Sequence, residues 1–173
     1  KVVETNLMLQ DEHHPFLINL YNNMGTSYQD FGEYSLSIRY LEKVIDLAPE
    51  SGKYWNNLGD AYLANQEWNH AEACFKKALE LLLQTNKPED QARIARPYHN
   101  LALIYRHRGQ HNRALEYELR SLPYRKSDSK DLLGVARTYL GMGKCYFDLG
   151  QYQACLNCLD SALLLQRTVL PSL

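Results

Sequence analysis

The sequence predicts an all-α fold, a solenoid of about four antiparallel helix pairs. Apolar residues recur with a helical period along most of the 173 residues. One pattern also repeats, starting at Tyr21, Trp55, Tyr98 and Tyr139, so that successive copies are 34, 43 and 41 residues apart. Units of this length cannot bury their apolar faces alone, so we expect them to stack on one another.

The first helix of each unit is predicted from an aromatic residue, an apolar residue three positions later, a small residue at the fourth and tyrosine at the seventh. These positions lie on one helical face. The four sets are Tyr21, Met24, Gly25 and Tyr28; Trp55, Leu58, Gly59 and Tyr62; Tyr98, Leu101, Ala102 and Tyr105; and Tyr139, Met142, Gly143 and Tyr146.

A turn and a second amphipathic helix follow in every unit. The predicted turn residues are Gly32, Gln66, Gly109 and Gly150. The second helix carries one small residue at a fixed position, which is Ser37, Ala71, Ala114 or Cys155. Small residues on both helices permit their close approach.

The spacing also predicts the organisation of the chain. We expect a single array with residues 1–15 as the end of a preceding helix and a loop, then repeats at 16–51, 52–94, 95–135 and 136–173. The extra residues of the longer intervals should lengthen the helices beside them. We expect the array to be a fragment of a longer protein.

These motifs resemble the tetratricopeptide repeat (TPR) family between Phe16 and Arg167. The second unit matches the family motif at every signature position except the final proline, and Pro49 supplies that proline in the first unit. The longer intervals are similar to those of kinesin light chains and spindle-orientation adaptors. The resemblance implies a right-handed α-α superhelix acting as a scaffold or adaptor in protein binding and signalling. Two residues depart from the pattern: Glu118 occupies a usually apolar position, and Pro97 should mark a helix start or kink.

Composition argues against several other classes of protein. No apolar run approaches the roughly 18 residues that cross a bilayer, so we expect no membrane partner. The net charge of −1 disfavours nucleic acid as a partner. Four cysteines in helical segments favour a reducing, cytoplasmic location. Residues 1–94 carry 8 basic against 14 acidic residues, whereas residues 95–173 carry 11 against 6.

The residues that could carry chemistry have simpler explanations. His107 and His111 flank the turn at Gly109, so they do not form a metal-binding pair on one helix. Cys155 and Cys158 form a C-x-x-C in mid-helix, where packing is the better interpretation. We therefore expect no enzyme activity, no catalytic residue, no metal and no cofactor.

The resemblance implies that the first helix of each unit lines a concave groove. Asparagine recurs two positions after the leading aromatic, which suits the clamping of a peptide backbone. Basic residues recur two positions before it and could pair with carboxylates. Apolar residues lie toward the C-terminal end. The expected partner-binding residues are Asn23, Lys53, Asn56, Asn57, Asp60, Arg96, His99, Asn100, Leu103, Arg106, Arg137, Leu140, Lys144 and Phe147.

The groove predicts a non-catalytic scaffold that binds an extended acidic or acidic-apolar segment of another protein. The same surface residues could also do no more than solvate the helices. Two other functions stay open. One is a ligand- or peptide-sensing regulatory region of a larger signalling protein or transcription regulator. The other is a self-associating or autoinhibitory array, because oppositely charged halves could dock in a salt-sensitive way.

Overall fold

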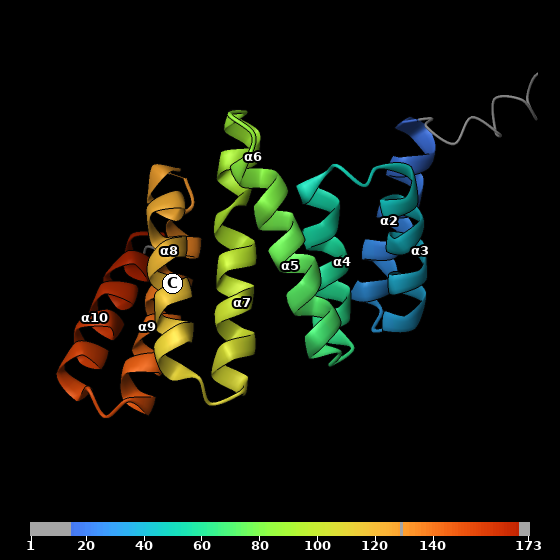
Figure 1. Ribbon diagram of the computed structural model, residues 1–173. Coiled ribbons are helices and arrows are strands. Elements are labelled where there is room, and N and C mark those ends of the chain that lie inside the picture. The colour runs from blue at the N-terminus through green and yellow to red at the C-terminus, as the bar shows by residue number, and fades with distance from the viewer. Residues whose placement is uncertain (1–14, 129, 170–173) are drawn as a thin grey trace, which may run out of the picture. The chain divides into compact units, whose positions relative to one another are not determined.

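The computed structural model describes residues 15–128 and 130–169 (Figure 1). Within these residues the secondary structure is helical and no strand is present, which confirms the all-α prediction. None of the described helices is long and apolar enough to cross a membrane. The chain divides into two compact units, residues 1–81 and 82–173, which are described separately below.

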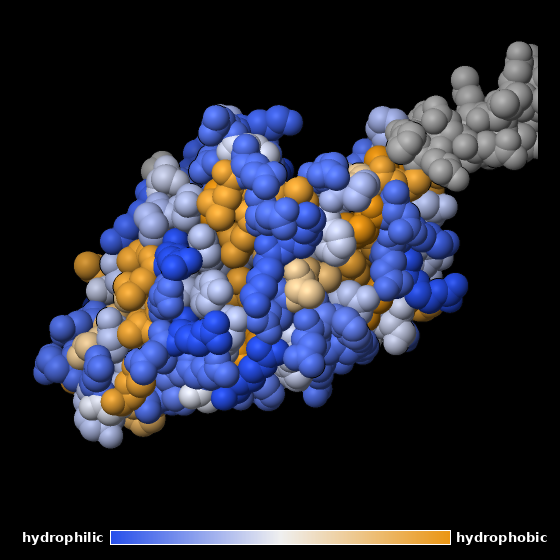
Figure 2. Space-filling model, in the orientation of Figure 1, coloured by the Kyte–Doolittle hydropathy of each residue, from blue (hydrophilic) through white to orange (hydrophobic). Residues whose placement is uncertain are grey.

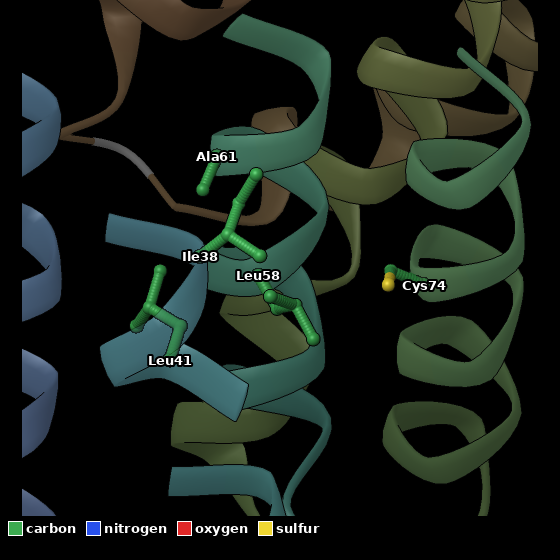
Figure 3. Close-up of a cluster of buried hydrophobic side chains, with 5 residues drawn as sticks. All are labelled: Ile38, Leu41, Leu58, Ala61 and Cys74. Atoms are coloured by element: carbon green, nitrogen blue, oxygen red, sulfur yellow. The ribbon is translucent and has the colours of Figure 1, made fainter. Parts of the chain in front are cut away.

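Unit 1 contains the first repeat and most of the second. Its helices are α2 (Pro15–Asp30), α3 (Tyr34–Leu47), α4 (Gly52–Ala64) and α5 (Trp68–Leu83), whose last residues lie beyond the unit boundary. The core of the unit forms where α3, α4 and α5 meet, as Figure 3 shows. Its buried members are Ile38, Leu41, Leu58, Ala61 and Cys74, and Ile45, Trp55 and Tyr62 pack at its edge.

The predicted small residues of the first helices are needed for this packing. A Cβ added to Gly25 would lie 2.6 Å from Leu41 Cγ, and one added to Gly59 would lie 2.6 Å from an aromatic carbon of Phe75. Real Cβ atoms do not approach other atoms so closely. The two glycines therefore let the second helix of each repeat lie directly against the first.

Unit 2 contains the last two repeats and one additional short helix. Its helices are α6 (Pro88–Arg93), α7 (Ala95–His107), α8 (His111–Ser127), α9 (Leu132–Asp148) and α10 (Tyr152–Val169). Helix α7 pairs with α8, and α9 pairs with α10. Pro97 lies in the first turn of α7, where its missing N–H costs no helical hydrogen bond, so the predicted helix start is confirmed.

The extra residues of the longer repeats are used in two ways. Helices α8 and α9 each extend to 17 residues, as the spacing predicts. The earlier insertion instead forms α6, a separate helix of 6 residues that the sequence analysis did not anticipate. Its first turn contains Pro88 with two acidic residues, Glu89 and Asp90, which are typical of a helix start.

The four predicted turn residues adopt the same left-handed backbone. Their φ angles are 82° at Gly32, 62° at Gln66, 71° at Gly109 and 73° at Gly150. Glycine enters this region without a steric penalty, but a residue with a Cβ does not. Gln66 is the only non-glycine residue with positive φ among the residues that the structure describes.

Candidate functional site

In unit 1, three of the predicted partner-binding residues form hydrogen bonds within the chain. Asn57 Nδ2 on α4 donates a hydrogen bond of 2.8 Å to Asn22 Oδ1 on α2. Asn56 Nδ2 donates to Asp60 Oδ2 at 3.1 Å. Asn22 and Asn56 are buried, at 8% and 6% exposure. The Asn57–Asn22 hydrogen bond therefore connects the first helices of the two repeats, whereas the Asn56–Asp60 bond lies within α4.

The remaining predicted residues of unit 1 are more accessible. Asn23 is exposed on α2. Lys53 is half-buried, and its Nζ lies 5.0 Å from the centre of the Tyr54 ring. The α2–α4 surface thus carries amides, one ammonium and one carboxylate, and it has little net charge.

In unit 2, the predicted residues lie on α7 and α9, which are in contact. They recur at intervals of three or four residues, which places each set on one face of its helix. We call this surface the α7–α9 face. Its predicted members are Arg96, His99, Asn100, Leu103, Arg106, Arg137, Leu140, Lys144 and Phe147.

The α7–α9 face combines basic and apolar side chains. Arg96, Arg137 and Lys144 are exposed, and Arg106 is half-buried. Among the residues that the structure describes, neither Arg137 nor Lys144 forms an ion pair with an acidic side chain. This face can therefore offer a partner cationic groups that the chain has not already neutralised.

The apolar part of this face is also accessible. Leu140 is 43% exposed and Phe147 is 61% exposed. The Phe147 and Tyr152 rings pack edge to face at a centroid distance of 5.9 Å. Figure 2 shows the side of the molecule on which α8 lies in front of α9, and hydrophobic residues are visible there too.

Beneath the face lies a buried polar pair. His99 Nδ1 on α7 is 2.9 Å from Glu118 Oε1 on α8. Glu118 is 1% exposed, and this burial raises its pKa above the ordinary value, although the hydrogen bond from His99 acts in the opposite direction. The residue that departs from the repeat pattern is thus packed in the core and paired.

The predicted asparagine position differs in exposure from repeat to repeat. Asn23 is exposed and Asn57 is half-buried, but Asn100 is only 7% exposed. In the fourth repeat the same position is Gly141, where a Cβ would overlap the Glu118 carboxylate. Residues at the same position of the repeat are therefore not equally accessible to a partner. The peptide-clamping role of these amides stays a prediction.

One further residue of this surface was missed by the sequence analysis. Leu133, in the first turn of α9, is 54% exposed. It precedes Arg137 by four residues and Leu140 by seven, so it lies on the same helical face. The position of Leu133 four residues before Arg137 and seven before Leu140 could have identified it. It was missed because α9 begins several residues before the repeat motif.

The histidine and cysteine motifs take the places expected of them. His107 ends α7 and His111 begins α8, so the turn at Gly109 separates them, and His111 Nδ1 lies 3.2 Å from Asp148 Oδ2. Within residues 15–128 and 130–169, no three His, Cys, Asp or Glu side chains are placed to share a metal ion. Cys155 and Cys158 are buried, which confirms the packing interpretation.

Burial also makes the thiols of Cys145 and Cys74 poor nucleophiles. It raises the pKa of Cys145 to about 11 and that of Cys74 to about 12. The reactive form of cysteine is the thiolate, which is scarce at neutral pH when the pKa is this high.

Comparison with known proteins identifies the repeat. A family model described as tetratricopeptide repeat matches residues 51–127, and a second model with the same description matches residues 18–51 and 136–168. The chain is also 24% identical over 102 residues to the general transcriptional corepressor ssn6 of Schizosaccharomyces pombe. The matched part is 59% of this chain and 9% of that protein, so the chain spans a small part of its length.

Solved structures share the fold at low sequence identity. BtubC (BKLC) from P. vanneervenii aligns with a TM-score of 0.78 and 21% identity, over 88% of this chain and 64% of that one. A putative kinesin light chain from Podosopora anserina, with nearly identical TPR-like repeats, aligns with a TM-score of 0.75 and 19% identity, over 99% and 84% of the two chains. MamA aligns with a TM-score of 0.72 and 21% identity, over 95% and 85%.

Proposed function

Because the chain belongs to the tetratricopeptide repeat family, whose repeats are protein-interaction scaffolds, we propose that its α7–α9 face binds an extended acidic or acidic-apolar segment of another protein. The proposed function is binding without catalysis. The observation that carries it is the gathering of four basic side chains and several exposed apolar ones on matching faces of two adjacent helices. Exposed apolar side chains beside Arg137 and Lys144, which have no ion-pair partner among the described residues, suit a partner that carries both carboxylates and apolar side chains.

Each kind of side chain has a distinct part in this proposal. Arg96, Arg106 and Arg137 pair with carboxylates, because a guanidinium can donate two parallel hydrogen bonds to one carboxylate. Leu140 and Phe147 receive the apolar side chains of the segment. A segment of this composition is disordered when free, so it can adopt an extended form along the helices.

The α2–α4 surface supports a weaker, less specific contact. Asn57 uses one of its two amide hydrogens on Asn22, and it retains a carbonyl oxygen that can accept from a peptide backbone. With Lys53 and Asp60 both present, this surface has no charge preference. We therefore assign the recognition of acidic side chains to unit 2 alone.

The test is a binding measurement with a peptide library. Labelled peptides in which Asp and Glu alternate with Leu and Phe are titrated with the chain at low salt, and fluorescence anisotropy reports binding. The Arg96→Glu/Arg137→Glu variant should weaken the best binder at least tenfold, while helicity and Tm change little. A matched control, Arg113→Glu/Arg120→Glu, makes the same change of charge on exposed residues of α8.

Two results would contradict the proposal. One is equal weakening by both double variants, because this would show only a loss of general positive charge. The other is retention of binding by Arg96→Glu/Arg137→Glu. Purely acidic peptides without Leu or Phe should bind more weakly than the alternating ones, and duplex DNA should compete poorly at the same ionic strength.

A second candidate function is a regulatory region of a larger protein. The observation in its favour is the likeness to a transcriptional corepressor of which the chain spans only 9%. Fusing the chain to a heterologous DNA-binding domain beside a reporter gene tests it. Repression that is lost with Arg96→Glu/Arg137→Glu would support this role, and an unchanged reporter would oppose it.

A further inference from the structure

The last described helix presents apolar residues at positions that are buried elsewhere in the chain. Leu156 and Leu159 on α10 are 54% and 39% exposed. Their counterparts in the first repeat, Ile38 and Leu41 on α3, are 7% and 0% exposed. The next position of the same stripe is Leu163, which is 47% exposed, and its counterpart is Ile45. The exposed face of α10 therefore has the apolar composition of the equivalent face of α3, which the next repeat covers.

The first described helix shows the complementary pattern. Met24 and Ser27 on α2 correspond to Leu58 and Ala61 on α4, which are 4% and 0% exposed. Ser27 is exposed and Met24 is half-buried. A hollow of about 360 Å³ opens on this side of α2. It is lined by Leu20, Asn23, Met24, Ser27, Tyr28 and Phe31.

The contact between α3 and α4 inside unit 1 shows how these two faces combine. There Ile38 and Leu41 of one repeat pack against Leu58 and Ala61 of the next (Figure 3). The same pair of faces is present, unused within the described residues, on α10 and on α2. One chain thus carries both halves of an interface that it already forms internally.

We infer that a second copy of this chain docks head to tail, with α10 of one copy against α2 of the other, in the manner of the α3–α4 contact. The net charges of the two units support a second copy of the chain as the partner. Residues 1–81 carry 6 basic against 12 acidic residues, for a net charge of −6. Residues 82–173 carry 13 against 8, for +5. The two units that meet in this arrangement attract each other over long range.

The contact is heterologous, because two different faces meet. Each added copy brings a further α10 face and a further α2 face, so copies can keep adding until the assembly either closes into a ring or continues as an open chain. The inference does not rest on the proposed peptide-binding function, since neither docking face includes a residue of the α7–α9 face.

The experiment measures mass against concentration by light scattering coupled to size exclusion. Leu156→Arg blocks the α10 face, and Ser27→Arg blocks the α2 face. Both residues are exposed, so neither change should alter the fold, which circular dichroism checks. Leu119→Arg is the matched control on α8, where the other repeats have Glu42, Lys76 and Asp160 at the same position.

The wild type and Leu119→Arg should show masses that rise with concentration and fall when salt is added. Each face variant alone should be a monomer, with the dissociation constant raised at least tenfold. A mixture of the two face variants should form a dimer and nothing larger, because each partner then supplies one intact face. A monomeric wild type, a mixture that stays monomeric, or a Ser27→Arg variant that still dimerises through α10 would overturn the inference.

Discussion

The Glu118 carboxylate on α8 occupies the space that a side chain at Gly141 on α9 would need. A Cβ added to Gly141 would overlap Glu118 Oε1. The carboxylate cannot move easily to solvent, because it is 1% exposed and paired with His99. In the other three repeats, asparagine stands where Gly141 does. The buried pair and this glycine therefore belong to one structural arrangement.

The first prediction concerns this overlap. Gly141→Ala should lower the free energy of unfolding by about 1 to 3 kcal/mol, because it overpacks a filled site. Gly143→Ala is the matched control in the same helix. Its Cβ would meet Leu159 Cδ2 at 3.4 Å, an ordinary contact, and alanine favours the helix by about 1 kcal/mol. Urea denaturation of both variants makes the comparison, and equal effects would contradict the role assigned to Glu118.

The second prediction concerns the pH dependence of stability. Burial raises the pKa of Glu118 in the folded chain, while His99, Arg125 and Arg106 act against that rise. A carboxyl group with a raised folded pKa stabilises the fold most at low pH. Its contribution is lost as the pH rises from the ordinary glutamate value of 4.5 through the raised value.

Glu118→Gln removes this titration while keeping the shape of the side chain. The stability of the variant relative to the wild type should therefore increase as the pH rises from 4.5 toward neutrality. Denaturant titrations at several pH values measure it. A difference that is constant with pH would show that the folded and unfolded pKa values of Glu118 are equal, and a difference that decreases would show that the folded pKa is lowered; either would contradict the prediction.

The third prediction separates binding from stability. Phe147→Ala should weaken the best library peptide by about 1 to 2 kcal/mol, because the ring is a proposed apolar anchor. The free energy of unfolding should change by less than about 0.5 kcal/mol, because the ring is mostly exposed. Leu119→Ala, on the exposed side of α8, should leave binding unchanged. Isothermal titration calorimetry and urea denaturation give the two quantities.

The fourth prediction uses the turn between α4 and α5. Gln66 has a φ of 62°, whereas the equivalent turns have glycine. Gln66→Gly should raise the free energy of unfolding by about 0.5 to 1 kcal/mol, because it relieves a left-handed conformation that disfavours a Cβ. The gain is partly offset by the greater freedom of glycine in the unfolded chain. A loss of stability would mean that the Gln66 side chain makes a contact worth more than this strain.

Much of the fold could be predicted from local pattern. The aromatic, small and tyrosine positions identified the first helices, because each of these residues packs against a neighbouring helix at a fixed position of the repeat. The turn glycines could be read in the same way, since they require positive φ. The short helix α6 could not, because an insertion with Pro88 and acidic residues is compatible with either a loop or a helix start.

The candidate site was harder to predict. The sequence placed Asn23, Asn57 and Asn100 at one position, but exposure depends on neighbours from other helices. The pairing of His99 with Glu118 joins residues 19 positions apart on two helices, so no local pattern contains it. The exposure of Leu156 and Ser27 depends on which faces the chain itself covers, and only the three-dimensional structure shows this.

The most direct measurement of the central claim is an NMR titration of the isotope-labelled chain with the best acidic-apolar peptide. Amide shifts should change first and most along the α7–α9 face, at Arg96, Leu103, Arg137, Lys144 and Phe147, with little change on α8. Shifts confined to α8, α10 or unit 1, or an unaltered spectrum at saturating peptide, would contradict the assignment of peptide recognition to this face.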